Sequence, residues 1–218
     1  MSNMEIGKFI TFEGIEGVGK STNIRHMVNA IENAGHAVLT TREPGGTPMA
    51  ERIRELVAEH GDEQMPDVAE LLLVFASRAL HVNNVIRPAL AAGTWVICDR
   101  FTDSSRAYQG GGRGLPPENI DHLAEWVHGD LVPDLTILLD APVETGMERA
   151  GRRSDPDRFE TEQNDFFQRV RATYLKIAAE HPERFVVVDA ALSLEAVQNE
   201  IEDIAAALLG GQYNQYLL

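Results

Sequence analysis

The sequence has little cysteine, little aromatic content and few basic residues. Its one cysteine, Cys98, excludes an intramolecular disulfide and a zinc site built from cysteines. Aromatic residues make up 6%, and no apolar run approaches the roughly 18 residues of a membrane-spanning helix. The 19 Lys and Arg residues stand against 34 Asp and Glu, for a formal net charge of −15. Because so acidic a chain is repelled by phosphate backbones and anionic lipids, we expect it to bind neither nucleic acid nor membrane.

What is present fits a single globular domain. The hydrophobic fraction is 44% and the charged fraction 24%, both close to globular averages. The 218 residues contain no internal repeat, low-complexity tract or linker, so we expect one domain over residues 1–218. Residues 1–8 lack the basic and apolar segments of a signal peptide, which favours a cytoplasmic protein.

Short apolar, β-prone runs alternate with helical patterns along the chain. The expected strands are residues 8–13, 37–41, 94–98, 135–139 and 185–188. The expected helices are residues 20–34, 48–60, 68–87 (ended by Pro88), 117–128, 143–150, 162–180 and 193–210. Strands that are apolar on both faces are typical of sheets covered by helices on both sides. The pattern predicts an α/β fold with a doubly wound five-stranded parallel sheet, which binds ligands at the carboxyl ends of its strands.

A phosphate-binding loop follows the first expected strand. Residues 14–21 read Gly-Ile-Glu-Gly-Val-Gly-Lys-Ser and match the pattern G-x-x-x-x-G-K-[ST] at the start of a helix. The glycines let backbone N–H groups converge on an anion, and the helix N-terminus adds its positive end. Lys20 is expected to reach the β and γ phosphates and Ser21 to hold Mg²⁺. The residues expected to bind the nucleoside triphosphate, which is ATP if the family resemblance below holds, are Gly14, Ile15, Glu16, Gly17, Val18, Gly19, Lys20, Ser21 and Thr22.

The loop alone does not separate a GTPase, a motor ATPase and a small-molecule kinase. No Asn-Lys-x-Asp run is present to read guanine. Asp99 and Asp140 each end an expected strand, and either could hold Mg²⁺-bound water. We favour Asp99 because Arg100 follows at once, and a guanidinium can bind a phosphate through two hydrogen bonds. A phosphate-binding arginine outside the loop indicates a second phosphorylated substrate.

Three further segments carry a family resemblance. Residues 99–109, Asp-Arg-Phe-Thr-Asp-Ser-Ser-Arg-Ala-Tyr-Gln, resemble the signature D-R-[FYH]-x-x-S-x-x-A-Y-Q of thymidylate kinases. Residues 41–47 resemble the R-E-P-G-G-T loop of that family, and residues 157–160 resemble the D-R-[IFY]-E at the end of its lid. The resemblance, to the bacterial type, implies transfer of a phosphoryl group from ATP to dTMP during dTTP synthesis. It also implies a Mg²⁺ requirement, a homodimer and a short basic lid at about residues 149–160.

The resemblance assigns the acceptor site residue by residue. Arg42 and Arg100 would hold the dTMP phosphate, and Glu16 would accept from the 3′-hydroxyl. Phe75 would stack on thymine while Arg78 donates to its O4 atom. Some relatives carry the aromatic residue four positions before the arginine, and this chain has valine there.

The end of the signature would face the base and sugar. Gln109 offers both a donor and an acceptor to a pyrimidine edge. Tyr108 would crowd the sugar C2′ and exclude a ribose hydroxyl, and Ser104 would join the base or phosphate network. The glycine-rich segment at residues 110–114 is expected to be a mobile surface loop.

An arginine of the lid would neutralise the negative charge on the phosphoryl group during its transfer. Some thymidylate kinases carry an arginine in the phosphate loop where this chain has Gly17, so here the cation is expected from the lid. Arg153 is the first choice and Arg149 the second. With Lys20, Asp99 and Arg100 they complete the expected catalytic set.

Three alternatives to this function stay open at the level of sequence. One is a kinase for another acceptor, such as dCMP or free thymidine. Another is a P-loop switch or partitioning ATPase, which would hydrolyse ATP without an acceptor. The third is an inactive binding module, which the intact Lys20, Ser21, Asp99 and Arg100 disfavour.

Overall fold

A single parallel sheet organises the chain. The computed structural model describes residues 7–59, 63–151, 158–159 and 162–211. Its sheet has five strands in the order β2-β3-β1-β4-β5, and all four neighbouring pairs are parallel. The strands are β1 (Phe9–Glu13), β2 (Val38–Arg42), β3 (Trp95–Asp99), β4 (Leu135–Asp140) and β5 (Phe185–Asp189). The predicted α/β fold with a five-stranded parallel sheet is confirmed.

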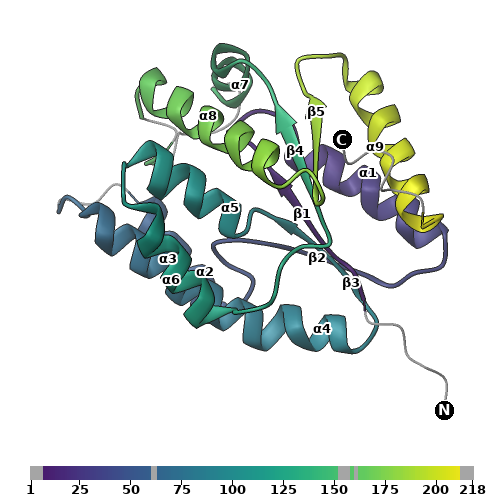
Figure 1. Ribbon diagram of the computed structural model, residues 1–218, viewed down its shortest axis with the longest axis horizontal. Helices are drawn as coiled ribbons and strands as arrows, with labels where there is room; N and C mark the ends of the chain where they lie inside the picture. Colours follow the sequence, from purple (N-terminus) through teal and green to yellow (C-terminus); the bar gives the residue numbers. More distant parts are fainter. Residues whose placement is uncertain (1–6, 60–62, 152–157, 160–161, 212–218) are drawn as a thin grey trace.

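Helices cover both faces of the sheet, as Figure 1 shows. Helices α1 and α9 lie on one face, helices α2 to α6 and α8 lie on the side of the other, and α7 lies beyond the carboxyl ends of the strands against the phosphate loop. The bounds are α1 (Lys20–Asn33), α2 (Pro48–Ala58), α3 (Asp67–His81), α4 (Arg87–Ala91), α5 (Thr102–Ser105), α6 (Pro117–Val127), α7 (Val143–Ala150), α8 (Asn164–Glu180) and α9 (Leu194–Leu209). Two π-helical segments, η1 (Val82–Ile86) and η2 (Arg106–Gly112), complete the described elements.

The three central strands, β3, β1 and β4, are buried on both faces along almost their whole length. Ile10 and Phe12 of β1, Ile97 of β3 and Ile137 of β4 have no exposed surface. This burial removes apolar area from water on both sides of the sheet, which is the main favourable contribution to folding. Among the described residues, none of the helices combines the length and apolar character needed to cross a bilayer.

The carboxyl ends of β1, β2 and β3 come together at one edge. In the parallel register, Asp99 of β3 pairs with Phe12 of β1 and with Arg42 of β2. The phosphate loop leaves β1 at this edge, and Arg100 follows β3 there. The topology therefore places the loop of residues 14–21 beside the start of the 99–109 signature.

The expected end of the long helix at Pro88 is wrong. The helical run continues through η1 into α4, which ends at Ala91, with Pro88 in the first turn of α4. A proline ring clashes with the carbonyl four residues earlier in a regular α-helix. The wider π-helical turn before Pro88 relieves that conflict, and a proline is well tolerated in a first turn.

The expectation of a mobile loop at residues 110–114 is also wrong. Residues 106–112 form η2, which packs against α8. A Cβ atom at Gly111 would lie 2.0 Å from the Thr173 hydroxyl oxygen, and one at Gly112 would lie 2.4 Å from the Phe166 ring. These glycines allow close helix packing, and Arg113 after them is held by ion pairs to Glu70 and Glu162.

Candidate active site

The phosphate loop has the backbone shape that its glycines allow. Gly14, Gly17 and Gly19 all have positive φ angles, of 132°, 74° and 93°. Helix α1 starts at Lys20 without a side-chain cap, so the first N–H groups of the helix face the loop. The Lys20 ammonium donates to the carbonyl oxygens of Gly14 and Ile15 at 3.0 and 2.9 Å. The loop therefore presents main-chain donors and one cation to an anion.

Gly17 has no room for a side chain. A Cβ atom there would lie 1.9 Å from the carbonyl oxygen of Gly146 in α7. An arginine at this position of the loop would require α7 to move. The packing therefore excludes an arginine at position 17 unless α7 is displaced.

Burial changes the acidity of two groups around the loop. Desolvation, with repulsion from Arg100, lowers the pKa of Lys20 to about 8. Desolvation also raises the pKa of Glu13, at the end of β1, to about 7, with a contribution from Asp103. Glu13 accepts hydrogen bonds from the Phe101 backbone and the Ser104 and Tyr174 hydroxyls at 2.6 to 2.9 Å. This buried carboxyl holds the start of the signature against β1.

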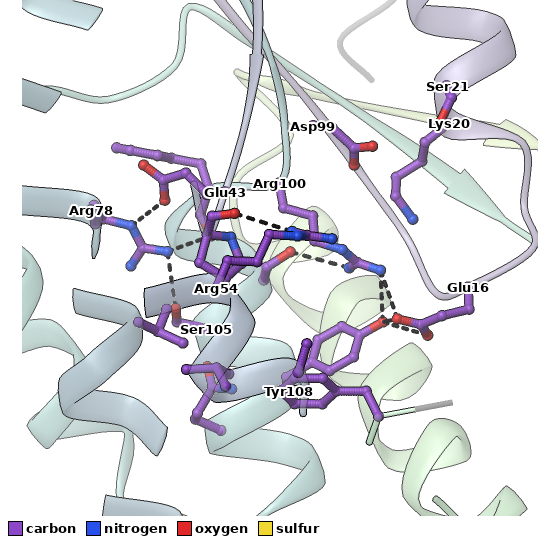
Figure 2. Close-up of a pocket in the computed structure, with 18 of the residues that line it drawn as sticks. Glu16, Lys20, Ser21, Glu43, Arg54, Arg78, Asp99, Arg100, Ser105 and Tyr108 are labelled. Carbon is purple, nitrogen blue, oxygen red and sulfur yellow. Dashed lines mark hydrogen bonds and ion pairs between the residues drawn. The ribbon is translucent and has the colours of Figure 1, made fainter. Parts of the chain in front are cut away.

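One cavity joins the phosphate loop to the far end of the signature. Figure 2 shows Lys20 and Ser21 at one side of it, Arg78 and Ser105 at the other, and Asp99 and Arg100 between them. Residues far apart in sequence thus line a single space. Of the predicted site residues, the lining includes Glu16, Gly17, Gly19, Lys20, Ser21, Arg78, Asp99, Arg100, Ser104, Tyr108 and Gln109.

Arg100 lies at the centre of the cavity wall. It has a φ of 70° and is the one non-glycine residue with positive φ in the described chain. Its Nη2 donates to Glu16 at 2.9 Å and to the Tyr108 hydroxyl at 3.0 Å, and its guanidinium lies 4.7 Å from the centre of the Tyr108 ring. Burial opposes its charge, but its acidic neighbours raise the pKa of Arg100 well above its usual value. A permanently charged, preoriented guanidinium is suited to a phosphate dianion.

Asp99 and Ser21 have the chemistry to hold a Mg²⁺ ion beside the phosphate loop. Asp99 Oδ1 is buried and, within the described residues, has no hydrogen-bond partner. Both residues line the cavity beside Lys20. Carboxylate and hydroxyl oxygens are the ligands that Mg²⁺ takes, directly or through water. Asp140 differs, because both of its oxygens accept from Arg171 at 2.7 and 2.8 Å and it does not line the cavity.

The other end of the cavity holds a fixed arginine. Arg78 Nε donates to Glu43 at 2.6 Å, and its Nη2 donates to the Phe101 carbonyl and the Ser105 hydroxyl at 3.1 Å. Although burial favours the neutral acid, Arg78 and His81 hold the pKa of Glu43 below its usual range. In the described part of the chain, Arg78 Nη1 is buried without a hydrogen-bond acceptor. It is therefore available as a donor to a ligand.

This chain is similar in sequence to known proteins over nearly its whole length. The family model described as thymidylate kinase matches residues 12–201. The chain therefore belongs to the thymidylate kinase family.

Individual relatives agree. A thymidylate kinase of Pseudomonas putida is 54% identical over 203 residues, 93% of this chain and 97% of the relative. One of Methylococcus capsulatus is 52% identical over 208 residues, 95% of this chain and 99% of the relative. The crystal structure of the Ehrlichia chaffeensis thymidylate kinase superposes with a TM-score of 0.74 at 33% identity, covering 92% of this chain and 98% of that one. The family resemblance that the motifs indicated is confirmed.

Two predicted substrate residues lie outside the cavity. Phe75 is 2% exposed and packs with Leu71 and Ile120, whereas the preceding residue, Val74, lines the cavity. Phe75 therefore does not face the space in which a base would stack. Its ring lies under Arg78 instead, 4.5 Å from the guanidinium carbon, and so supports the arginine from behind.

Arg42 is the second residue that the structure does not bring to the cavity. Its side chain is 52% exposed and pairs with Glu51 at 2.8 Å. Arg54 of α2 lines the cavity instead, with its Nη1 donating to the Pro44 carbonyl at 3.1 Å. The peptide bond between Glu43 and Pro44 is cis. Sequence reasoning missed Arg54 because it lies in a helix after the recognised loop and belongs to none of the quoted motifs.

The remaining predicted residues either do not line the cavity or lie outside the described residues. Gly14, Ile15, Val18 and Thr22 belong to the loop and the first turn of α1 but do not line the cavity. Arg149, in α7, donates to the Ala190 carbonyl at 2.7 Å and also lies outside the lining. Arg153 and most of the expected lid lie outside the described residues. Phe159, near the end of the expected lid, does line the cavity and packs edge-on against Tyr108.

Proposed function

We propose that this chain transfers the γ-phosphoryl group of ATP to dTMP, giving ADP and dTDP for dTTP synthesis. Membership of the thymidylate kinase family makes it a kinase. The observation that carries the specific reaction is the single cavity, which runs from the phosphate-loop lysine past Arg100 to the fixed guanidinium of Arg78. In this proposal the space holds two phosphorylated ligands with their phosphates facing each other.

The residues divide the work between donor and acceptor. The phosphate loop and Lys20 would bind the ATP phosphates, and Arg100 with Arg54 would hold the dTMP phosphate in line with them. Arg78, Ser105 and Gln109 would bind the base, and Tyr108 would lie under the sugar. Phosphoryl transfer depends mainly on positioning and charge neutralisation, so no strong general base is required.

Glu16 has a defined place in this arrangement. Its carboxylate accepts from Arg100 and from the Tyr108 hydroxyl, at 2.7 to 2.9 Å. These partners offset the repulsion between a carboxylate and the nearby phosphates. We propose that Glu16 accepts from the 3′-hydroxyl of dTMP while it keeps Arg100 in place.

Magnesium is proposed to bind with ATP. Ser21 and Asp99 would hold it, and the ion would neutralise charge on the donor phosphates. The buried Asp99 Oδ1, which has no hydrogen-bond partner in the part of the chain that the structure describes, supports this proposal.

Other properties expected from the sequence stay predictions. They are one domain over residues 1–218, a cytoplasmic location, a homodimer, and a lid at about residues 149–160 that carries Arg149 and Arg153. Exposed apolar side chains on α3, Val68 and Leu72, would supply surface for a subunit contact. The acidic charge of −15 supports the absence of nucleic acid and membranes among its partners.

The proposed reaction is tested by supplying one acceptor at a time. ADP formation is measured with ATP and Mg²⁺ and with dTMP, dUMP, dCMP, thymidine or no acceptor. We expect the highest kcat/KM with dTMP and little ADP without an acceptor, and no activity from Lys20→Ala purified in the same way. Acceptor-independent ADP formation would instead identify an ATPase, and a preference for dCMP or thymidine would identify another kinase.

A further inference from the structure

Glu70 is a buried carboxylate that the reaction described above does not use. It lies on α3, two turns before Arg78, and has no exposed surface. Its Oε1 accepts from Gln109 Nε2 at 2.8 Å. Its Oε2 forms an ion pair with Arg113 Nη2 at 3.2 Å and accepts a hydrogen bond from Arg158 Nη2. Glu70 thus joins α3 to the last residue of the signature.

The contact with Glu70 decides which way the Gln109 amide faces. An ionised carboxylate only accepts hydrogen bonds, whereas a glutamine amide has a donor end and an acceptor end. Gln109 must therefore turn its nitrogen toward Glu70. Its oxygen then faces away, and no hydrogen bond in the described part of the chain reaches it. Gln109 is 3% exposed and lines the cavity, so it cannot turn freely in solvent.

This orientation complements the donor on Arg78. Arg78 and Gln109 line the same cavity, and among the described residues the buried Nη1 of the first and the oxygen of the second have no hydrogen-bond partner. One is a donor and the other an acceptor. On a thymine or uracil edge, the adjacent groups O4 and N3–H are an acceptor and a donor. On a cytosine edge, the corresponding groups are a donor and an acceptor, which would oppose both side chains.

We propose that Glu70 is a positioning residue that fixes the Gln109 amide so that its oxygen accepts from the N3–H group of the acceptor base. The proposal rests on the proposed phosphorylation of dTMP and deepens it. Without Glu70, the amide can turn its nitrogen toward the base, where two donors would face each other. A buried donor left without a partner weakens binding by about tenfold or more.

Glu70 also binds two arginines, so a purely structural role has to be separated from the proposed one. A variant at Gln109 distinguishes the two roles. If Glu70 acts on the base through Gln109, removing the Gln109 amide must abolish the effect of changing Glu70. If Glu70 acts by holding Arg113 and Arg158, its effect must persist without that amide.

The experiment is a double-mutant cycle with Glu70→Gln, Gln109→Leu and the two combined. Gln at position 70 keeps the shape of glutamate but can donate to the Gln109 oxygen and stabilise the wrong orientation. KM for dTMP, dUMP and ATP, kcat and the melting temperature are measured for each. We expect Glu70→Gln to raise KM for dTMP and dUMP about tenfold by the same factor, because both bases carry N3–H, with KM for ATP unchanged. The double variant should be no worse than Gln109→Leu.

Asp67→Asn is the matched control. Asp67 lies one turn before Glu70 on α3, is half exposed, and lies 3.6 Å from Arg113 without contacting Gln109. The substitution removes the same charge from the same helix, and we expect KM for dTMP to stay within about twofold of wild type because exposed ion pairs contribute little.

A swap variant provides a second test should Glu70→Gln alone fold poorly. Glu70→Gln combined with Gln109→Glu keeps one carboxylate and one amide in the cluster, and Glu at position 109 can only accept. We expect this variant to restore KM for dTMP to near the wild-type value.

Three results would overturn the proposal. The first is a KM for dTMP that does not change in Glu70→Gln. The second is a double variant whose KM for dTMP rises by the product of the two single-variant factors. The third is a swap variant whose KM for dTMP is as high as that of Gln109→Leu. If the wild-type protein does not phosphorylate dTMP, the proposed function itself is wrong. The wild-type assay shows this before any variant is made, so the two failures are distinguishable.

Discussion

Arg100 and Glu16 form an ion pair of 2.9 Å that connects the end of β3 to the phosphate loop. The pair lies in the cavity wall, with side chains only 17% and 14% exposed. Because Glu16 has this partner, a carboxylate is tolerated inside a loop built for anions. The same contact holds Arg100 in the position from which it would meet an incoming monophosphate.

Replacing Arg100 and replacing Arg42 should have very different effects on the rate of dTMP phosphorylation. Removing the Arg100 guanidinium by Arg100→Ala should lower kcat for dTMP phosphorylation about 100-fold to 1,000-fold, because a preoriented cation at the phosphates is lost. Arg42→Ala should change kcat/KM by less than about fivefold, because its exposed ion pair with Glu51 contributes little. Steady-state kinetics on both variants, with melting temperatures as a folding control, check this. A larger loss from Arg42→Ala than from Arg100→Ala would restore the sequence-based assignment of Arg42.

The lowered pKa of Lys20 predicts that kcat/KM for ATP falls on the alkaline side of its pH profile. Its pKa is lowered to about 8, so the ammonium loses its proton as the pH rises through that value. Because the protonated form binds phosphates, kcat/KM for ATP should fall above pH 8 in the free enzyme. Lys20→Arg stays charged over the accessible range and should move the falling limb to higher pH, even if its overall rate is lower. The same limb in both proteins would assign it to another group.

Asp99 and Asp140 form a matched pair for the magnesium proposal. Both end strands of the sheet, but only Asp99 lines the cavity. Asp99→Asn should raise the Mg²⁺ concentration needed for half-maximal rate about 10-fold to 100-fold, the usual effect of altering an outer partner of a bound metal. Asp140→Asn, whose partner is Arg171, should leave that concentration unchanged. Titration of the rate with Mg²⁺ at saturating ATP measures both, and equal shifts would contradict the assignment to Asp99.

The fold and the loop were predictable because they depend on local signals. Apolar strand composition, capping residues and the glycine pattern act within a few residues of one another, and Ser193 and Thr47 cap their helices as such residues do. The order and spacing of the motifs placed the loop and the signature at one edge of the sheet. Lys20, Asp99, Arg100 and Tyr108 lie where that reasoning expected them.

The missed residues depend on geometry that sequence does not carry. Val74 and Phe75 are neighbours on one helix, and a rotation of about 100° between adjacent positions decides which of them faces the cavity. Arg54 reaches the site through the packing of α2 beside the loop at residues 43–47. The π-helical turns at η1 and η2 have no local composition signal. The first carries the helical run past the end expected at Pro88, and the second takes the place of part of the loop expected at residues 110–114.

The most direct measurement is an experimental structure of this protein with ADP, Mg²⁺ and dTMP bound. Our account predicts the ADP phosphates in the loop of residues 14–21, the dTMP phosphate within hydrogen-bond distance of Arg100, and thymine O4 and N3 facing Arg78 and Gln109. A monophosphate bound away from Arg100, or a cavity without a pyrimidine between Arg78 and the phosphate loop, would contradict it.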